Sequence, residues 1–147
     1  MITKPFVCVL LAALAGPAVA APPCVSLEGG WVRLPPMAGM PMAAGFGRIH
    51  NNCAAPVAVT AVRSEGFAEV TLHETRRVDG VSRMREIERL PIAAGASAEL
   101  KPGGLHLMLM QPEAPLVEGA QVPLRLSLED GSKVDGVLQV RREAPAR

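Results

Sequence analysis

The chain has 147 residues, with 15 Lys and Arg, 14 Asp and Glu, and a formal net charge of +1 at pH 7. This length predicts a single domain, and the near-neutral charge and an aromatic content of only 3% exclude nucleic acid as an expected partner. Neither GxSxG nor HExxH is present, so no hydrolase motif supports an enzymatic activity, and none is expected.

The first 20 residues have the three-part layout of a secretory signal peptide. Lys4 precedes an apolar run over 6–14, and small residues end in Ala18-Val19-Ala20. The run is too short to span a bilayer, so we expect cleavage after Ala20 and a mature domain over 21–147. A retained membrane anchor is the alternative. No Cys stands at the cleavage site to take a lipid, and no later segment has membrane-spanning length, which predicts an exported, soluble protein.

Two cysteines remain in the mature chain, Cys24 and Cys53, because Cys8 lies within the signal peptide. An even pair in an exported protein predicts a disulfide. Closing a loop of about 30 residues would stabilise the fold by roughly 3–4 kcal/mol in the chain-entropy model. A thiol pair that binds metal or exchanges disulfides is the alternative, but the CxxC spacing typical of such pairs is missing.

Short alternating runs bounded by turn residues recur along the mature chain, which is typical of a β-sandwich or barrel. Asp79-Gly80 and Asp130-Gly131 predict tight hairpins. The segments 91–97 and 111–121 are expected to be loops. We predict one all-β sandwich of seven to nine short strands, drawn from 31–34, 44–50, 56–62, 68–74, 81–87, 97–101, 103–110, 122–129 and 133–140.

The early loop PPMAGMPMAAG (35–45) combines Pro and Gly with three methionines. Thioethers on an exported loop are soft ligands suited to copper, so Met37, Met40 and Met42 are candidates for an accessory metal site. Filling gaps in the packing is the alternative role for these side chains.

The strand GGLHLMLM (103–110) has two unlike faces, because successive side chains of a strand point to opposite sides. One face is apolar and is predicted to enter the core; it consists of Leu105, Leu107 and Leu109. The other face carries His106, Met108 and Met110. The sequence therefore places an imidazole in line with two thioethers.

A second His and Met are predicted to meet across the hairpin at Asp79-Gly80. Counting outward from a two-residue turn sets Met84 opposite Thr75, so Met84 is the diagonal neighbour of His73. Diagonal cross-strand neighbours lie about 7–8 Å apart, within joint reach of one ion for long side chains.

Two imidazoles and two thioethers form a selective donor set: His73, Met84, His106 and Met108. Thioether sulfur binds hard cations poorly, and structural zinc prefers thiolate, imidazole or carboxylate. Cu(I) suits this set best, and the lack of a thiolate argues against a blue-copper electron-transfer centre. On residue chemistry alone, a metal-free structural sandwich with core methionines and hydrogen-bonded histidines stays open.

Two further residues lie outside this set. His50 in GRIHNN is expected to have a turn or hydrogen-bonding role, and Met110 is expected to pack. A zinc hydrolase with His50, His73 and His106 as ligands and an open water position is a competing hypothesis, although no HExxH motif supports it.

The four candidate ligands are spaced H-x10-M-x21-H-x-M, from His73 to Met108. This spacing resembles the signature of the PCuAC family, which are periplasmic copper(I) chaperones with a cupredoxin-like β-sandwich. The surrounding text resembles the family over roughly 28–140, in AAGFGRIHNN (43–52), EVTLHET (69–75), DGVSRMR (79–85) and LKPGGLHLMLM (100–110).

The resemblance implies a periplasmic, monomeric carrier of one Cu(I) per chain. The ligands it implies are His73, Met84, His106 and Met108. It also implies delivery of copper towards the CuA centre of cytochrome c oxidase, with oxidase subunit II or another periplasmic copper chaperone as the partner. General copper sequestration or tolerance is the alternative function. The pair of Cys24 and Cys53 is not part of the metal motif.

Overall fold

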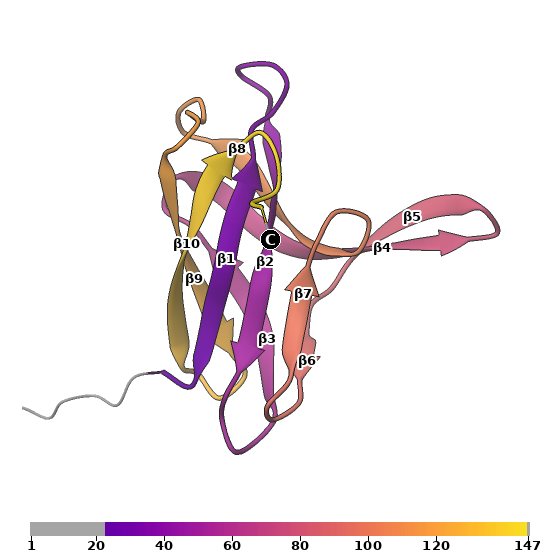
Figure 1. The fold of residues 1–147 in the computed structure, drawn as a ribbon, viewed down its shortest axis with the longest axis vertical. Coiled ribbons are helices and arrows are strands. Elements are labelled where there is room, and N and C mark those ends of the chain that lie inside the picture. Colours follow the sequence, from indigo (N-terminus) through magenta and orange to yellow (C-terminus); the bar gives the residue numbers. More distant parts are fainter. Residues whose placement is uncertain (1–22, 147) are drawn as a thin grey trace, which may run out of the picture.

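The computed structural model describes residues 23–146 and shows an all-β fold (Figure 1). The predicted signal peptide, 1–20, lies outside the described residues. Within 23–146, no helix is long and apolar enough to cross a membrane. The strands are β1 Val25–Arg33, β2 Met42–Asn51, β3 Val57–Arg63, β4 Phe67–Val78, β5 Val81–Glu86, β6 Leu90–Ile92, β7 Ser97–Leu100, β8 Leu105–Pro112, β9 Gln121–Leu128 and β10 Lys133–Arg141.

The strands form one sheet that curls round on itself into a barrel-like sandwich. Neighbours follow the order β4-β8-β2-β1-β10-β9-β3, and β3 pairs back with β4 through Val62 and Val70. The first and last strands, β1 and β10, lie parallel and side by side. Closure leaves β5 and β6 as the ends of the sheet, and β7 runs between β2 and β8. The predicted all-β class is confirmed.

Several strands differ from the sequence-based prediction. The described residues contain ten strands where seven to nine are predicted, β4 continues past the predicted 68–74 to Val78, and β8 continues to Pro112, into the predicted loop 111–121. Leu90–Ile92, expected partly within a loop, forms β6 against β3, with Leu90 and Ile92 buried and Pro91 exposed. A three-residue strand with a central proline is tolerated at a sheet edge but resembles a loop in the sequence. Strand β1 begins at Val25, six residues before the predicted 31–34. Gly29 and Gly30 interrupt the alternation in the sequence, and a register shift between Glu28 and Trp31 accommodates them within the strand.

The core consists of alternate residues of the barrel strands. Leu107 and Leu109 of β8 are fully buried, and Leu105 is half-buried, so the predicted leucine face of this strand does enter the core. Burying a leucine side chain stabilises a fold by about 1.5–3 kcal/mol, so these residues fix which way β8 faces. His106 and Met108 consequently lie on the outer face of the barrel.

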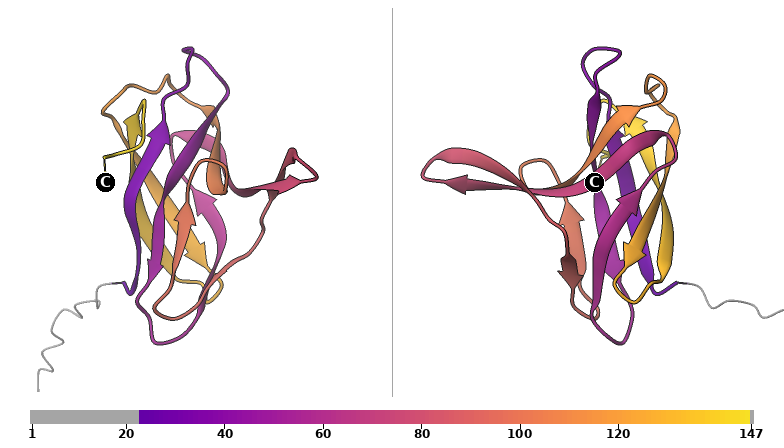
Figure 2. Two further views of the ribbon diagram at one scale, coloured as in Figure 1. Left: turned by 45° about the vertical axis from the view of Figure 1, so that its right-hand side comes forward. Right: turned by 180° about the vertical axis from the view of Figure 1, so that it is seen from behind.

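The hairpin of β4 and β5 projects from the barrel as an arm (Figures 1 and 2). Its turn has Asp79 at φ 51° and Gly80 at φ 78°, the two positive values that a two-residue hairpin turn of this kind requires. The predicted register is confirmed, since Thr75 pairs with Met84. All six residues of β5 are exposed.

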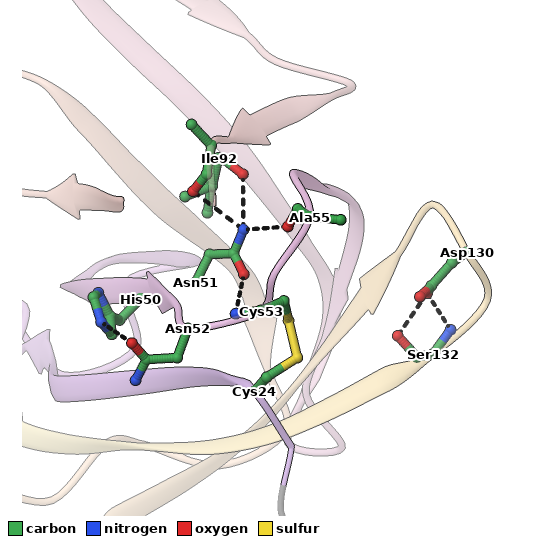
Figure 3. The surroundings of a disulfide bond; sticks show 10 residues. Cys24, His50, Asn51, Asn52, Cys53, Ala55, Ile92, Asp130 and Ser132 are labelled. Atoms are coloured by element: carbon green, nitrogen blue, oxygen red, sulfur yellow. Dashed lines mark hydrogen bonds between the residues drawn. A yellow bond between two sulfur atoms is a disulfide. The ribbon is translucent and has the colours of Figure 1, made fainter. Parts of the chain in front are cut away.

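A disulfide ties the start of β1 to the loop after β2 (Figure 3). The Cα atoms of Cys24 and Cys53 are 5.0 Å apart, and the predicted pairing is present. Beside it, the fully buried Asn51 side chain donates hydrogen bonds to the carbonyl oxygens of Ala55, Ile92 and Ala93 at 3.0–3.1 Å. Its own oxygen accepts the Cys53 N–H at 2.9 Å. These bonds hold the loop in place independently of the sulfur bridge.

Candidate metal centre

The four candidate ligands come from three neighbouring strands, β5, β4 and β8. In the β4–β8 register, His73 pairs with His106 and Thr71 pairs with Met108. On the other side of β4, Met84 pairs with Thr75. Directly paired residues share a face of a sheet, so all four candidate ligands lie on the face opposite the core leucines.

Met84 and His106 meet over β4, although each belongs to a strand on a different side of it. The Met84 Sδ atom lies 3.2 Å from His106 Nε2. His106 Nδ1–H donates to the Gly104 carbonyl oxygen at 2.9 Å, which leaves Nε2 of the neutral ring with a free lone pair. Two donors bonded to one ion at about 2.0–2.3 Å lie roughly 3–4 Å apart. The observed separation therefore fits two ligands of the same ion.

His73 has one hydrogen-bonded and one unpartnered ring nitrogen. Its Nε2 lies 2.9 Å from the Thr71 hydroxyl oxygen, and its Nδ1 is buried without a hydrogen-bond partner among the described residues. The His73 and His106 ring centroids are 5.9 Å apart. Metal-binding histidines usually donate their second N–H to a neighbouring acceptor. Nδ1 is therefore the ring nitrogen of His73 that is left for a further ligand.

Met108 and Met84 differ in how far they are covered. Met108 is half-buried and follows His106 on the same face of β8, diagonal to His73 in the register. Met84 is 55% exposed on the arm, whereas His106 is 7% exposed. The donor set is therefore covered on the barrel side and open to solvent at Met84.

Glu74, the strand neighbour of His73, is held on the other face of the arm. Its carboxylate accepts hydrogen bonds from Arg76 and Arg85 and forms ion pairs with them at 2.7 and 3.0 Å. These hydrogen bonds, from Arg76 first and Arg85 second, lower the pKa of Glu74 below its ordinary value. The carboxylate is thus engaged away from the imidazoles and thioethers.

His50 and the three loop methionines, the remaining candidate metal ligands, lie away from the four-residue site. Both ring nitrogens of His50 are hydrogen-bonded, to Ser97 Oγ at 2.6 Å and to Asn52 Oδ1 at 2.8 Å, as expected for a structural histidine. Within 23–146, no group of three or more His, Cys, Asp or Glu side chains is placed to hold a metal, so a three-histidine zinc site has no structural support. The loop methionines line a separate pocket: Met37, Met40 and Met42.

Sequence reasoning missed two groups that position the imidazoles, the Thr71 hydroxyl and the Gly104 carbonyl. Thr71 precedes His73 by two residues on one strand face, and this spacing is a signal that the sequence does contain. The Gly104 carbonyl has no such signal. It accepts both His106 Nδ1–H and the Thr75 N–H, the latter at 3.1 Å, so it links the arm to β8.

Comparisons with known proteins agree with this architecture. Residues 25–140 match the family described as "Putative lipoprotein LpqE-like". The relative "Putative lipoprotein Lxx21020" of Leifsonia xyli subsp. xyli is 35% identical over 109 residues, which cover 74% of this chain and 64% of that protein. The chain thus matches less than two thirds of this relative's length.

Solved structures of PCuAC domains share the fold. The apo PCuAC domain from PmoF1 has a TM-score of 0.66 at 23% identity and covers 84% of this chain and 96% of its own. The copper-bound PCuAC domain from PmoF2 has a TM-score of 0.66 at 21% identity, covering 86% and 97%. CuI-DR1885 from Deinococcus radiodurans has a TM-score of 0.66 at 25% identity, covering 88% and 85%. The chain therefore belongs to the LpqE-like family and has the fold of PCuAC domains.

Proposed function

We propose that the mature protein, 21–147, is a periplasmic carrier that binds one Cu(I) and passes it to a partner protein. Its ligands are His73, Met84, His106 and Met108. The observation that carries this proposal is the 3.2 Å approach of Met84 Sδ to His106 Nε2, with the second nitrogen of that ring committed to the Gly104 carbonyl. The buried, unpartnered Nδ1 of His73 on the adjacent strand supports a third ligand.

The chemistry of the donors favours Cu(I) over other ions. Thioether and imidazole are neutral ligands, so the site keeps the full positive charge of the ion and binds harder divalent cations poorly. Within 23–146 no thiolate is available, since Cys24 and Cys53 are joined to each other. A site without thiolate binds copper reversibly, as a carrier requires.

The candidate ligands differ in solvent exposure, and this difference favours transfer of the ion to a partner. His106 is nearly buried at 7% exposure, whereas Met84 is 55% exposed on the projecting arm. An approaching acceptor reaches the ion from the Met84 side, and Met84 is the donor that it displaces first. The matched structures named "Copper-bound PCuAC domain from PmoF2" and "CuI-DR1885" support the same type of cargo.

The destination that we propose is the CuA centre of cytochrome c oxidase subunit II, reached directly or through a second copper chaperone. The protein itself is a carrier and performs no catalysis. Mixing the Cu(I)-loaded protein with a soluble apo CuA domain tests this destination. Appearance of the CuA absorption bands after addition of an oxidant is the expected result. Retention of all copper by the carrier would instead favour sequestration.

Copper binding itself is tested by competition titration of the oxidised mature protein against a chromophoric Cu(I) chelator. His106→Ala/Met108→Ala is the variant, and His50→Ala is the matched control, because its ring nitrogens are engaged elsewhere. We expect one tight equivalent in the wild type and in the control, and its loss in the double variant. Equal affinity in all three proteins would overturn the proposal.

A further inference from the structure

The outer face of β8, which carries the candidate ligands His106 and Met108, continues towards the end of the strand. Met110 follows Met108 on the same face, and in the β2–β8 register Met42 is the direct partner of Met110. One step back along the two strands, Ala44 is the partner of Met108. Met110 is half-buried and Met42 is 40% exposed, so the pair lies at the surface, reachable from solvent.

Cross-strand pairing brings these two thioethers within reach of one ion. Direct partners on one face have Cβ atoms about 4.5–5.5 Å apart, well within the joint span of two methionine side chains. On the other side of β8, Met110 pairs with Glu69 of β4, whose exposed carboxylate adds negative charge beside the pair. Residues two apart on a strand are separated by about 6.5–7 Å. Met110 therefore lies one such step from Met108.

The backbone next to Met42 and Met110 is held in place by a hydrogen bond between the two strands. The Gln111 N–H donates to the Pro41 carbonyl oxygen at 2.6 Å, which ties the end of β8 to the start of β2. Gln111 has φ 49°, a left-handed value that residues with a side chain rarely adopt. Strain of this kind persists where the surroundings enforce it, and it is concentrated at functional sites. Here it fixes the chain directly after Met110.

The methionine loop opens next to the same pair. Met37, Met40 and Met42 line a pocket of about 480 Å³ between this loop and the segment that follows β8. Met40 is half-buried, and Met37 is 68% exposed near the tip of the loop. Met40 lines this pocket together with Met42, which makes it the candidate for a third thioether, whereas Met37 is the most exposed of the three.

From this arrangement we infer a second Cu(I) site, anchored by Met42 and Met110 and completed by Met40. It contains thioethers but no imidazole, so it binds Cu(I) more weakly than the four-ligand site and independently of pH in the range where imidazole titrates. Met108 is the ligand of the four-ligand site that is nearest in β8 to Met110. Through Met108 the ion passes between the two sites as Cu(I), without a change of oxidation state. Binding at the second site stands alone; only this transfer step rests on the proposed function. The sequence-based expectation for Met110 is packing, and the second site is the alternative that we propose for it.

The test uses the oxidised mature protein with its methionine methyl groups labelled with 13C, titrated anaerobically with Cu(I) alone. The first equivalent is expected to shift the methyl signals of Met84 and Met108, and the second those of Met40, Met42 and Met110. Met42→Leu/Met110→Leu should lower the affinity for the second equivalent at least tenfold and leave the first within twofold. His50→Ala is the control, because both of its ring nitrogens are hydrogen-bonded elsewhere, and it should leave both equivalents unchanged.

The outcomes separate the two proposals. A wild type whose Met42 and Met110 methyl signals shift with none of the added equivalents, or a Met42→Leu/Met110→Leu variant that takes up two equivalents as the wild type does, overturns the second site. Shifts of the Met42 and Met110 methyl signals in the wild type support the site even where the double variant folds poorly. In the His106→Ala/Met108→Ala variant, the weaker equivalent should persist. Its persistence without any tight equivalent in the wild type would leave the second site standing and remove the proposed function.

Discussion

The disulfide is predicted to stabilise the fold without contributing to copper binding. Replacing both cysteines tests the effect on stability and the effect on copper binding in one variant. Cys24 and Cys53 are 29 residues apart in the sequence. For a loop of that length, the chain-entropy relation gives about 3.6 kcal/mol of stabilisation at 25 °C. For a domain of this size, that corresponds to a fall in Tm of about 10–15 °C in a Cys24→Ser/Cys53→Ser variant.

The native structure around the bridge has its own support, so the variant should still fold. The Asn52 N–H donates to the Cys24 carbonyl oxygen at 2.7 Å, and the Cys53 N–H donates to Asn51 Oδ1 at 2.9 Å. Neither bond uses a sulfur atom. Because the donors of the proposed copper site lie on β4, β5 and β8, we expect the folded variant to bind one tight equivalent of Cu(I) as the wild type does.

Urea denaturation of the oxidised wild type and the double variant measures the stability, and the chelator titration measures copper. A difference in the free energy of unfolding below about 1 kcal/mol would refute the chain-entropy reasoning. Loss of the tight equivalent from a variant that is folded at the temperature of the assay would refute the assignment of thioethers as the sulfur ligands.

Three further predictions concern single residues. Met84→Leu nearly conserves volume at an exposed position, so Tm should stay within about 2 °C while Cu(I) affinity falls at least tenfold; an unchanged affinity removes Met84 from the site. Thr71→Val removes the hydroxyl that holds His73 and should weaken Cu(I) binding by about 10–100-fold, whereas Thr71→Ser should retain it; equal losses in both would contradict the hydrogen-bond argument. The Asp130 carboxylate accepts bonds from the Ser132 hydroxyl and N–H, chiefly the hydroxyl, which lower its pKa below the ordinary 3.8. Asp130→Ala should therefore lower Tm at pH 7, and the difference should shrink as the pH falls from 3.8 through the lowered pKa of this carboxylate; a difference that stays constant as the pH falls below 3.8 would contradict this origin.

Turn geometry and the alternation of side chains along a strand were enough to predict the parts of the site that depend on residues close in the sequence. The Asp79-Gly80 turn defines the register of β4 and β5, so the position of Met84 opposite Thr75 follows from counting residues. The alternation of leucine with His and Met in β8 likewise predicts which face enters the core.

The long-range pairings could not be predicted in the same way, because strand order in a closed sheet is not a local property. The approach of Met84 to His106 requires β4 to lie between β5 and β8. The pairing of Met42 with Met110 joins strands that lie far apart in the sequence. The sequence alone therefore gives Met110 no partner, and only the register of β2 and β8 pairs it with Met42.

Long-range 1H–15N correlation spectra of the imidazole rings test most directly our proposal that one Cu(I) binds at His73 Nδ1 and His106 Nε2. After one equivalent of Cu(I), we expect large 15N shifts at those two nitrogens and little change at His50, whose ring is hydrogen-bonded elsewhere. Unchanged signals from His73 and His106, or a dominant shift at His50, would contradict it.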